Sequence, residues 1–210
     1  MRWMAVGLIL ALQAAACGAA AACEGQAGSV IFEDTFADDS GGWDTSAVVK
    51  PPNLVMTLGK TQVVQIENLT FEATFADYCI DFVLPTSPAP DNTVTAGIIL
   101  WAQNYDNYYL VMVASNGNVG LYKKSAAVFT TVVQATSPAF KAEPDAVNSL
   151  RVLASKDGKL TISLNGTPVK AIRAQAPQGA LRFGLMGQVD KPIDTNIDVR
   201  VKAYKVTAGN

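Results

Sequence analysis

The sequence of 210 residues contains no histidine. Catalytic groups of the Ser-His-Asp and Cys-His kinds, and the usual zinc sites, all need an imidazole near neutral pH. The absence of histidine excludes these chemistries together. Any catalysis by this chain would have to rest on carboxylates.

Charged residues are also few, and neither sign dominates. Lysine and arginine number 16 against 18 aspartates and glutamates, which gives a formal net charge of −2. Nucleic-acid-binding proteins concentrate positive charge on one face or in one segment. The small and evenly spread balance therefore predicts no nucleic acid among the partners.

No apolar run is long enough to span a bilayer, which takes about 20 residues. The longest, Trp3–Ala16, follows the positive charge of Arg2 and precedes an alanine-rich segment. This order of segments is typical of an export signal. We therefore assign residues 1–22 to a signal peptide and expect an exported protein, periplasmic or extracellular.

Cysteine is sparse, and two of the three cysteines can belong to the mature chain. Small residues stand directly before Cys23, as in a bacterial lipobox, so Cys23 is a candidate for lipidation and for the one membrane attachment we expect. Ordinary cleavage to a soluble protein is the alternative. In an oxidising compartment Cys23 and Cys79 could instead form a disulfide, which lipidation would forbid. A third interpretation makes Cys79 a small buried core residue.

The rest of the chain consists of short apolar or alternating segments separated by turns, with no convincing helix. Its centre, Val94–Lys124, predicts a three-stranded antiparallel meander, because polar turns interrupt it at Asn104–Asn107 and Ser115–Asn118. The other expected strands are Val30–Phe32, Asn53–Leu58, Thr61–Ile66, Phe71–Phe75, Tyr78–Leu84, Val128–Val133, Asn148–Ala154, Lys159–Leu164, Thr167–Ile172, Gly179–Met186 and Ile197–Val206.

Two pairs of consecutive segments are separated by short turns and are therefore predicted to form hairpins: Asn53–Leu58 with Thr61–Ile66, and Asn148–Ala154 with Lys159–Leu164. Roughly a dozen strands at this spacing are typical of an all-β, two-sheet antiparallel β-sandwich or jelly roll. We expect one such domain over residues 29–208.

Five segments carry turn and core signatures: Phe32–Trp43, Ala96–Tyr109, Asn148–Val152, Leu160–Val169 and Gly179–Leu185. Together they resemble the concanavalin A-like lectin and glucanase superfamily. More narrowly, they are similar to exported bacterial domains related to laminin G-like modules and to the 3-keto-disaccharide hydrolase-like domain. The resemblance implies a jelly roll whose first and last strands pair and whose concave sheet carries any ligand.

Aromatic and amide side chains gather around the first turn of the meander. Exposed rings stack on sugar faces, and neighbouring amides hydrogen-bond to hydroxyl groups. The candidate ligand-binding residues are Trp101, Gln103, Asn104, Tyr105, Asn107, Tyr108 and Tyr109. The alternative is that Trp101 and one tyrosine fill the core, since strand alternation sends Tyr108 and Tyr109 to opposite faces.

The acidic loop after the first strand offers oxygen ligands of the kind that calcium prefers. If the terminal strands pair, aspartates near the C-terminus could approach this loop. The candidate metal ligands are Asp34, Asp38, Asp39 and Asp198, with Asp44 and Asp194 as neighbours. The alternative is a solvated turn stabilised by capping aspartates, with no cofactor required.

Enzymes on this fold tend to place their carboxylates as Glu-x-Asp-x-x-Glu on one strand, and retaining glycosidases hold two carboxyls about 5 to 5.5 Å apart. None of the glutamates, Glu24, Glu33, Glu67, Glu72 and Glu143, stands in that arrangement. We therefore favour a non-catalytic module that binds glycan or another surface partner. A glycoside-processing enzyme of the 3-keto-disaccharide hydrolase-like type and a purely structural envelope protein are the alternatives.

Overall fold

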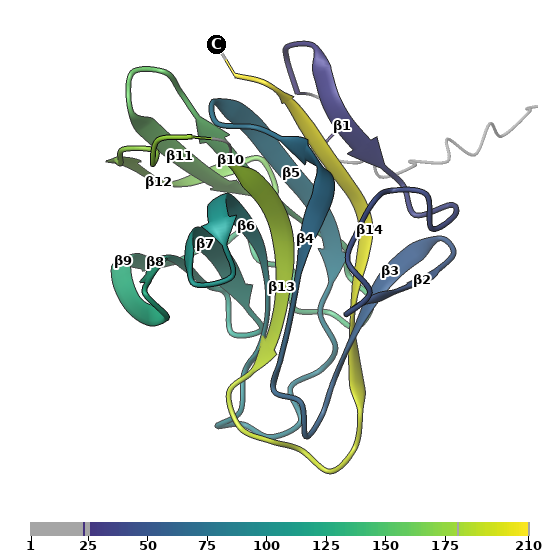
Figure 1. Ribbon diagram of the computed structural model, residues 1–210. Helices are drawn as coiled ribbons and strands as arrows, with labels where there is room; N and C mark the ends of the chain where they lie inside the picture. The colour runs from purple at the N-terminus through teal and green to yellow at the C-terminus, as the bar shows by residue number, and fades with distance from the viewer. Residues whose placement is uncertain (1–22, 24–25, 180, 210) are drawn as a thin grey trace, which may run out of the picture.

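The computed structural model describes residues 23, 26–179 and 181–209, and the expected signal peptide 1–22 lies outside them. Two antiparallel sheets stack face to face in this part of the chain (Figure 1). The described residues contain no α-helix, and thus none able to cross a membrane. The all-β, two-sheet sandwich predicted from the sequence is confirmed.

The larger sheet has eight strands, in the order β12-β11-β10-β5-β14-β3-β2, with β1 also paired to β14. Its strands are β1 (Val30–Asp34), β2 (Val48–Lys50), β3 (Asn53–Leu58), β5 (Ala76–Val83), β10 (Asn148–Ala154), β11 (Lys159–Leu164), β12 (Thr167–Arg173) and β14 (Ile197–Ala208). The first and last strands pair with Asp34 opposite Tyr204, as the resemblance implied.

The smaller sheet has six strands, in the order β4-β13-β6-β7-β8-β9. Its strands are β4 (Val63–Glu72), β6 (Val94–Asn104), β7 (Asn107–Ala114), β8 (Asn118–Ser125), β9 (Val128–Thr136) and β13 (Arg182–Val189). The predicted meander is confirmed as β6-β7-β8, and β9 continues it by pairing with β8.

The core lies between the two sheets and is built from the side chains that each strand turns inward. On β6, for example, Ile98 and Leu100 face the core, and the large buried side chains around them include Phe82, Phe183 and Tyr204. Tyr204 contacts the ring of Phe183 edge to face, with centroids 5.5 Å apart. Because this inward set is fully buried, the opposite set on the same strands is fixed as the outer face.

Three local expectations are wrong. Asn53–Leu58 and Thr61–Ile66 do not form a hairpin: β3 lies in the larger sheet and β4 in the smaller, so the turn at Gly59 carries the chain from one sheet to the other. Phe71–Phe75 is not a separate strand, since β4 runs on to Glu72. The three-residue strand β2 was not expected; it pairs with β3 across the cis Pro51–Pro52 turn.

Cys23 and Cys79 are joined by a disulfide in the structure. Cys79 is also almost fully buried, so two of the three interpretations left open by the sequence hold together. A sulfur atom in this bond cannot carry a lipid, which makes the disulfide and lipidation of Cys23 mutually exclusive. The bond ties the segment before β1 to the middle of β5.

We expect reduction of the disulfide to lower the free energy of unfolding by about 4 kcal/mol, because the bond closes a loop with a sequence separation of 56 residues in the unfolded chain. Urea unfolding of the oxidised protein, of the same protein in a phosphine reductant, and of the Cys23→Ala/Cys79→Ala double variant checks this. The reductant should have no effect on the double variant. Equal stability of the oxidised and reduced wild-type proteins would contradict the prediction.

Candidate functional site

The outer face of the six-stranded sheet carries a second, smaller apolar layer of its own. Ile99, Ala102, Tyr108, Leu110 and Met186 form this layer from β6, β7 and β13. Their positions follow from the register, in which Ile99 lies opposite Leu110 while the alternate residues point into the main core. The sheet therefore presents a floor of packed apolar side chains to whatever lies over it.

A groove of about 610 Å³ runs over part of this outer face, and we call it the face groove. It is lined by Val63, Thr93, Thr95, Met112, Ala114, Asn116, Asn118, Tyr122, Phe129, Thr131, Gln134, Gln188 and Asp190. Rings, amides and hydroxyls thus dominate its lining. Asp190, its one charged residue, accepts a hydrogen bond from the Thr93 hydroxyl.

Two glycines explain how the face groove is hollowed. A Cβ atom on Gly120 would lie 2.5 Å from Cε2 of Tyr122, so the Tyr122 ring occupies the space that a side chain at Gly120 would fill. Gln134 fixes this ring by donating a hydrogen bond from Nε2 to the Tyr122 hydroxyl, over 2.7 Å. A Cβ atom on Gly97 of β6 would lie 2.5 Å from the carbonyl oxygen of Val111 and 2.7 Å from Met112 Cγ, so this glycine allows β7 to approach closely. The Tyr122 ring thus lies close over Gly120 and is held there by Gln134.

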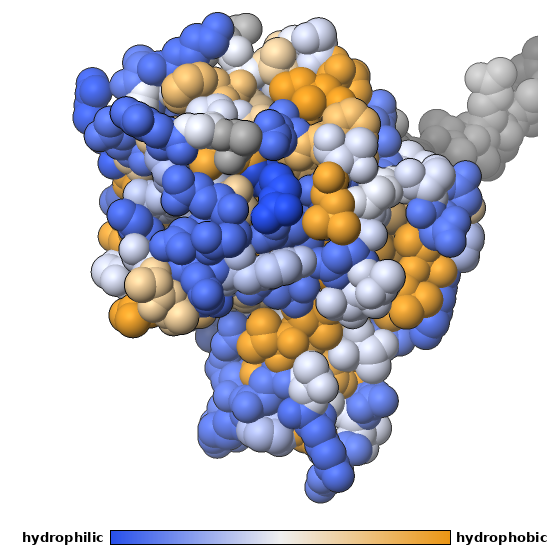
Figure 2. Space-filling model, in the orientation of Figure 1, coloured by the Kyte–Doolittle hydropathy of each residue, from blue (hydrophilic) through white to orange (hydrophobic). Residues whose placement is uncertain are grey.

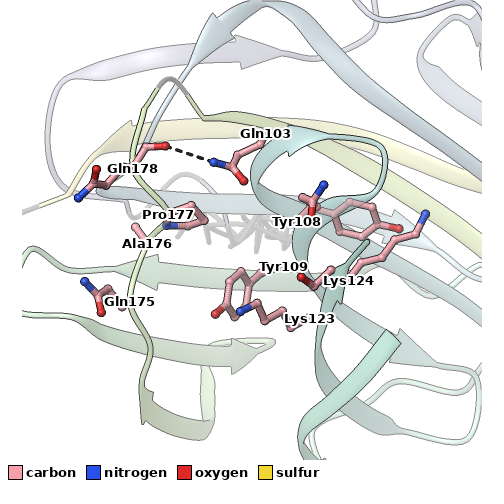
Figure 3. Close-up of a pocket in the computed structure, with 11 residues that line it drawn as sticks. Gln103, Tyr108, Tyr109, Lys123, Lys124, Gln175, Ala176, Pro177 and Gln178 are labelled. Atoms are coloured by element: carbon pink, nitrogen blue, oxygen red, sulfur yellow. Dashed lines mark hydrogen bonds between the residues drawn. The ribbon is translucent and has the colours of Figure 1, made fainter. Parts of the chain in front are cut away.

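A second hollow of about 420 Å³ lies at one end of the same sheet, and we call it the rim groove (Figure 3). Its lining is Gln103, Asn107, Tyr108, Tyr109, Lys123, Lys124, Ser125, Gln175, Ala176, Pro177 and Gln178. Figure 3 shows Tyr109 and Lys123 on the side toward the 175–178 segment, and Tyr108 with Lys124 on the other side of the strand. Gln103 closes one end by donating from Nε2 to the carbonyl of Gln178 over 3.3 Å.

A ridge of three side chains separates the two grooves. Tyr108, Lys124 and Phe129 lie directly opposite one another on β7, β8 and β9. The Tyr108 and Phe129 rings meet edge to face at 6.1 Å, and Lys124 Nζ lies 5.3 and 5.6 Å from their centroids. Tyr108 lines the rim groove and Phe129 the face groove, whereas Tyr109 and Lys123 of the rim groove project from the opposite face of the same strands.

Four of the seven predicted ligand-binding residues line the rim groove: Gln103, Asn107, Tyr108 and Tyr109. Asn104 and Tyr105 are exposed in the turn beside it. Asn104 Oδ1 accepts hydrogen bonds from Asp106 N and Asn107 Nδ2, each over 2.9 Å, and so shapes the turn.

Trp101 is a correction to the predicted set, because it belongs to the core. Its side chain is 2% exposed, and its Nε1 donates to the carbonyl of Thr74 over 2.6 Å. Strict alternation would have turned it outward, next to Ile99. A bulge after Leu100, with Trp101 at φ +56°, turns the ring inward, where it packs edge to face on Tyr109.

The predicted metal ligands are not brought together. Asp34 accepts hydrogen bonds from Phe36 N and Trp43 Nε1, and Asp38 accepts one from Ser40 N. Asp198 accepts one from the Thr57 hydroxyl. Asp34 pairs with Tyr204, six residues along β14 from Asp198, which places the two about 20 Å apart.

Within the described residues, the one close group of three cysteine or acidic donors is Cys23, Cys79 and Asp81, and the two cysteines are already bonded to each other. Asp34, Asp38, Asp39 and Asp198 therefore do not form a common calcium site in this fold. Asp34 and Asp38 instead accept hydrogen bonds from the backbone amides of Phe36 and Ser40, two residues further on, as in the alternative interpretation of a turn with capping aspartates.

Glu67 and Asp44, which the sequence did not predict to lie together, form a pair of acidic side chains at the β4 edge of the sheet. Glu67 is fully buried, and Arg182 Nη2 lies 2.8 Å from its Oε2 in an ion pair that lacks hydrogen-bond geometry. Neither carboxylate oxygen of Glu67 accepts a hydrogen bond from the described residues. Asp44, beside it, accepts hydrogen bonds from the Glu67 amide and the Tyr105 hydroxyl.

The surroundings shift the pKa values of these two carboxyls in opposite directions. Burial raises the pKa of Glu67 above its ordinary value of 4.5; Arg182 opposes this rise and the negative charge of Asp44 adds to it. Burial also acts to raise the pKa of Asp44, but hydrogen bonds from Tyr105, Ser46 and the Glu67 amide together lower it. Burial and the bond to Asp44 raise the pKa of Tyr105.

Neither protein-family models nor curated proteins match this sequence. Solved structures do match the fold. The carbohydrate recognition domain of Emp47p is 11% identical with a TM-score of 0.62, over 87% of this chain and 97% of that one. The β-glucanase of Bacillus licheniformis is 9% identical with a TM-score of 0.61, over 87% and 99%. The carbohydrate-binding module CBM66 of Bacillus subtilis is 13% identical with a TM-score of 0.51, over 74% and 94%.

These likenesses define the class: the chain has the concanavalin A-like jelly-roll fold. Lectin-type and hydrolytic proteins both occur among the neighbours, so the fold does not choose between binding and catalysis. That choice depends on the side chains of the two grooves.

The buried Glu67 gives a pH-dependent stability. Because its pKa is raised in the folded protein, the folded state holds the proton more tightly than the unfolded chain, and stability falls as pH rises above about 4.5. Glu67→Gln should remove this loss, so the variant gains stability over the wild type as pH rises from 4 to 8. Glu72→Gln, an exposed carboxylate on the same strand, is the control. Urea unfolding at several pH values checks this, and a parallel pH dependence of wild type and Glu67→Gln would rule it out.

Proposed function

We propose that the protein is an exported, non-catalytic glycan-binding module that holds sugar rings in the face groove. The observation that carries the proposal is the Tyr122 ring, which lies close over Gly120 and accepts a hydrogen bond from Gln134, in a groove also lined by the half-exposed ring of Phe129. Sugar rings have apolar faces that stack on aromatic side chains placed in this way. Their hydroxyls need the few well-placed polar groups that such a site supplies.

The polar lining supports a ligand rich in hydroxyl groups. Asn118, Gln134 and Gln188 bring amides to the groove, and each amide can both donate and accept hydrogen bonds. The apolar part of the molecular surface is divided into separate patches among hydrophilic residues on the face that Figure 2 shows. A large continuous apolar patch, typical of a protein-docking surface, is absent from that view.

The distribution of carboxylates supports binding without chemistry. The floor of the outer face is made of Ile99, Leu110 and Met186, and the rim groove has no carboxylate among its described lining residues. The carboxylate of Asp190, in the face groove, already accepts a hydrogen bond from the Thr93 hydroxyl. Glu67 has the raised pKa of a general acid but lines neither groove and is fully buried. A retaining mechanism needs two carboxyls flanking the scissile bond.

The fold neighbours add an analogy and no more. A carbohydrate recognition domain and a carbohydrate-binding module share the architecture at low identity. A purely structural role, the remaining alternative, does not require an open groove lined by the rings of Tyr122 and Phe129.

The proposal predicts that Tyr122→Ala and Phe129→Ala each weaken glycan binding about tenfold, because a stacked ring contributes about 0.5–1.5 kcal/mol beyond its buried area. A glycan array with the purified protein finds the ligand, and calorimetry measures the variants. Val132→Ala, an exposed apolar residue on β9 outside both grooves, should bind like the wild type. Failure to bind any glycan, or turnover of a 3-keto glycoside, would overturn the proposal.

We further expect glycan affinity to be unchanged when EDTA replaces calcium, since the loop aspartates and Asp198 are apart in the fold. Calorimetry measures the affinity for the same glycan in about 2 mM EDTA and in about 2 mM CaCl₂. A loss of binding in EDTA that calcium restores would show a metal site elsewhere in the chain.

A further inference from the structure

The rim groove contains a cation without an acidic partner. Lys123, opposite Tyr109 on the neighbouring strand, forms no ion pair with any residue of the described chain. Its Nζ lies 5.7 Å from the centroid of the Tyr109 ring, which holds the ammonium group over an aromatic face. The side chain is exposed and lines the groove (Figure 3).

The second lysine of this groove is already compensated. Lys124 Nζ donates to the carbonyl of Tyr105 over 2.6 Å and lies 3.6 Å from Asp106 Oδ1, and its side chain is only 15% exposed. Lys124 therefore braces the turn between β6 and β7. The charge left for a ligand is that of Lys123.

The remaining described lining adds hydrogen-bond donors and no negative charge. Amide groups come from Gln103, Asn107, Gln175 and Gln178, and a hydroxyl comes from Ser125. A neutral ligand would leave the Lys123 ammonium without a partner, whereas an anionic group would meet one positive charge and several amide N–H donors. Hydrogen bonds between charged groups are stronger than neutral ones.

We propose that the rim groove binds an acidic sugar unit, bearing a carboxylate or a sulfate ester, and that Lys123 is the residue that selects it. The inference rests on the proposed function and adds the chemical class of the glycan. Lys123 and Tyr122 are consecutive residues of β8 and project from opposite faces of the sheet, so the acidic unit bound beside Lys123 lies at the rim and not over the face groove.

Three trisaccharides test this by calorimetry at low salt: trigalacturonate, a sulfated galactotriose and neutral galactotriose. We expect at least one acidic trisaccharide to bind about five- to tenfold tighter than the neutral one, as for one charge-assisted contact at a partly exposed site. Which acidic ligand is preferred separates carboxylate from sulfate recognition. Raising the salt concentration should reduce the preference.

Lys123→Met keeps the aliphatic stem over Tyr109 and removes the charge, so it should bring the ratio of acidic to neutral affinity close to one. Lys60→Met, in an exposed turn outside both grooves, should leave the ratio unchanged. Equal affinity for acidic and neutral trisaccharides, or an unchanged ratio in Lys123→Met, overturns the assignment of Lys123. If Tyr122→Ala still weakens glycan binding in that case, the proposed function stands; if no glycan binds, both fail.

Discussion

The burial of one face of the six-stranded sheet determines what the other face can present. Ile98, Leu100 and Val111 fill the core between the sheets, and a shift of pairing by one residue would exchange them for Ile99 and Met112. The cost of exposing a full set of core side chains fixes the register of β6, β7 and β8. The face groove is therefore a consequence of the core, since its residues on these strands are those that the core leaves pointing outward.

One irregularity in this alternation has a large effect on the site. At the bulge after Leu100 three residues of β6 stand against one residue of β7, and the strand changes phase. Trp101 turns inward, and Ala102 takes a position in the outer apolar layer. Since β6 curls here, Gln103 reaches the 175–178 segment and the rim groove forms at the end of the sheet.

Local sequence was enough to predict the fold class and most strands, because turns such as Asn116–Gly117 and apolar alternation are local signals. It was not enough to find the partner of a strand. Asn53–Leu58 and Thr61–Ile66 alternate as a hairpin would, yet β3 pairs with β14, whose Asp198 is 141 residues from Thr57. Only the summed burial of both sheets decides between these pairings.

The same limit explains which site residues were missed. Tyr122 and Gln134 lie on the consecutive strands β8 and β9, but Gln188 lies on β13, and it reaches the same groove only through the register of the whole sheet. A local signal did exist for the first of them. Gly120 interrupts an otherwise good strand, and a glycine inside a strand often marks a close approach, here that of the Tyr122 ring.

The environment of Glu67 shows what burial of a carboxyl on this sheet involves. This single buried carboxyl at the β4 edge, even beside Arg182, has its charged form disfavoured. A second carboxyl in place of Ile99, Leu110 or Met186 would have to be desolvated in the same layer, where the described neighbours offer few hydrogen-bond donors. Under the proposed function, stacking and hydrogen bonding to a ligand use the apolar floor as it stands.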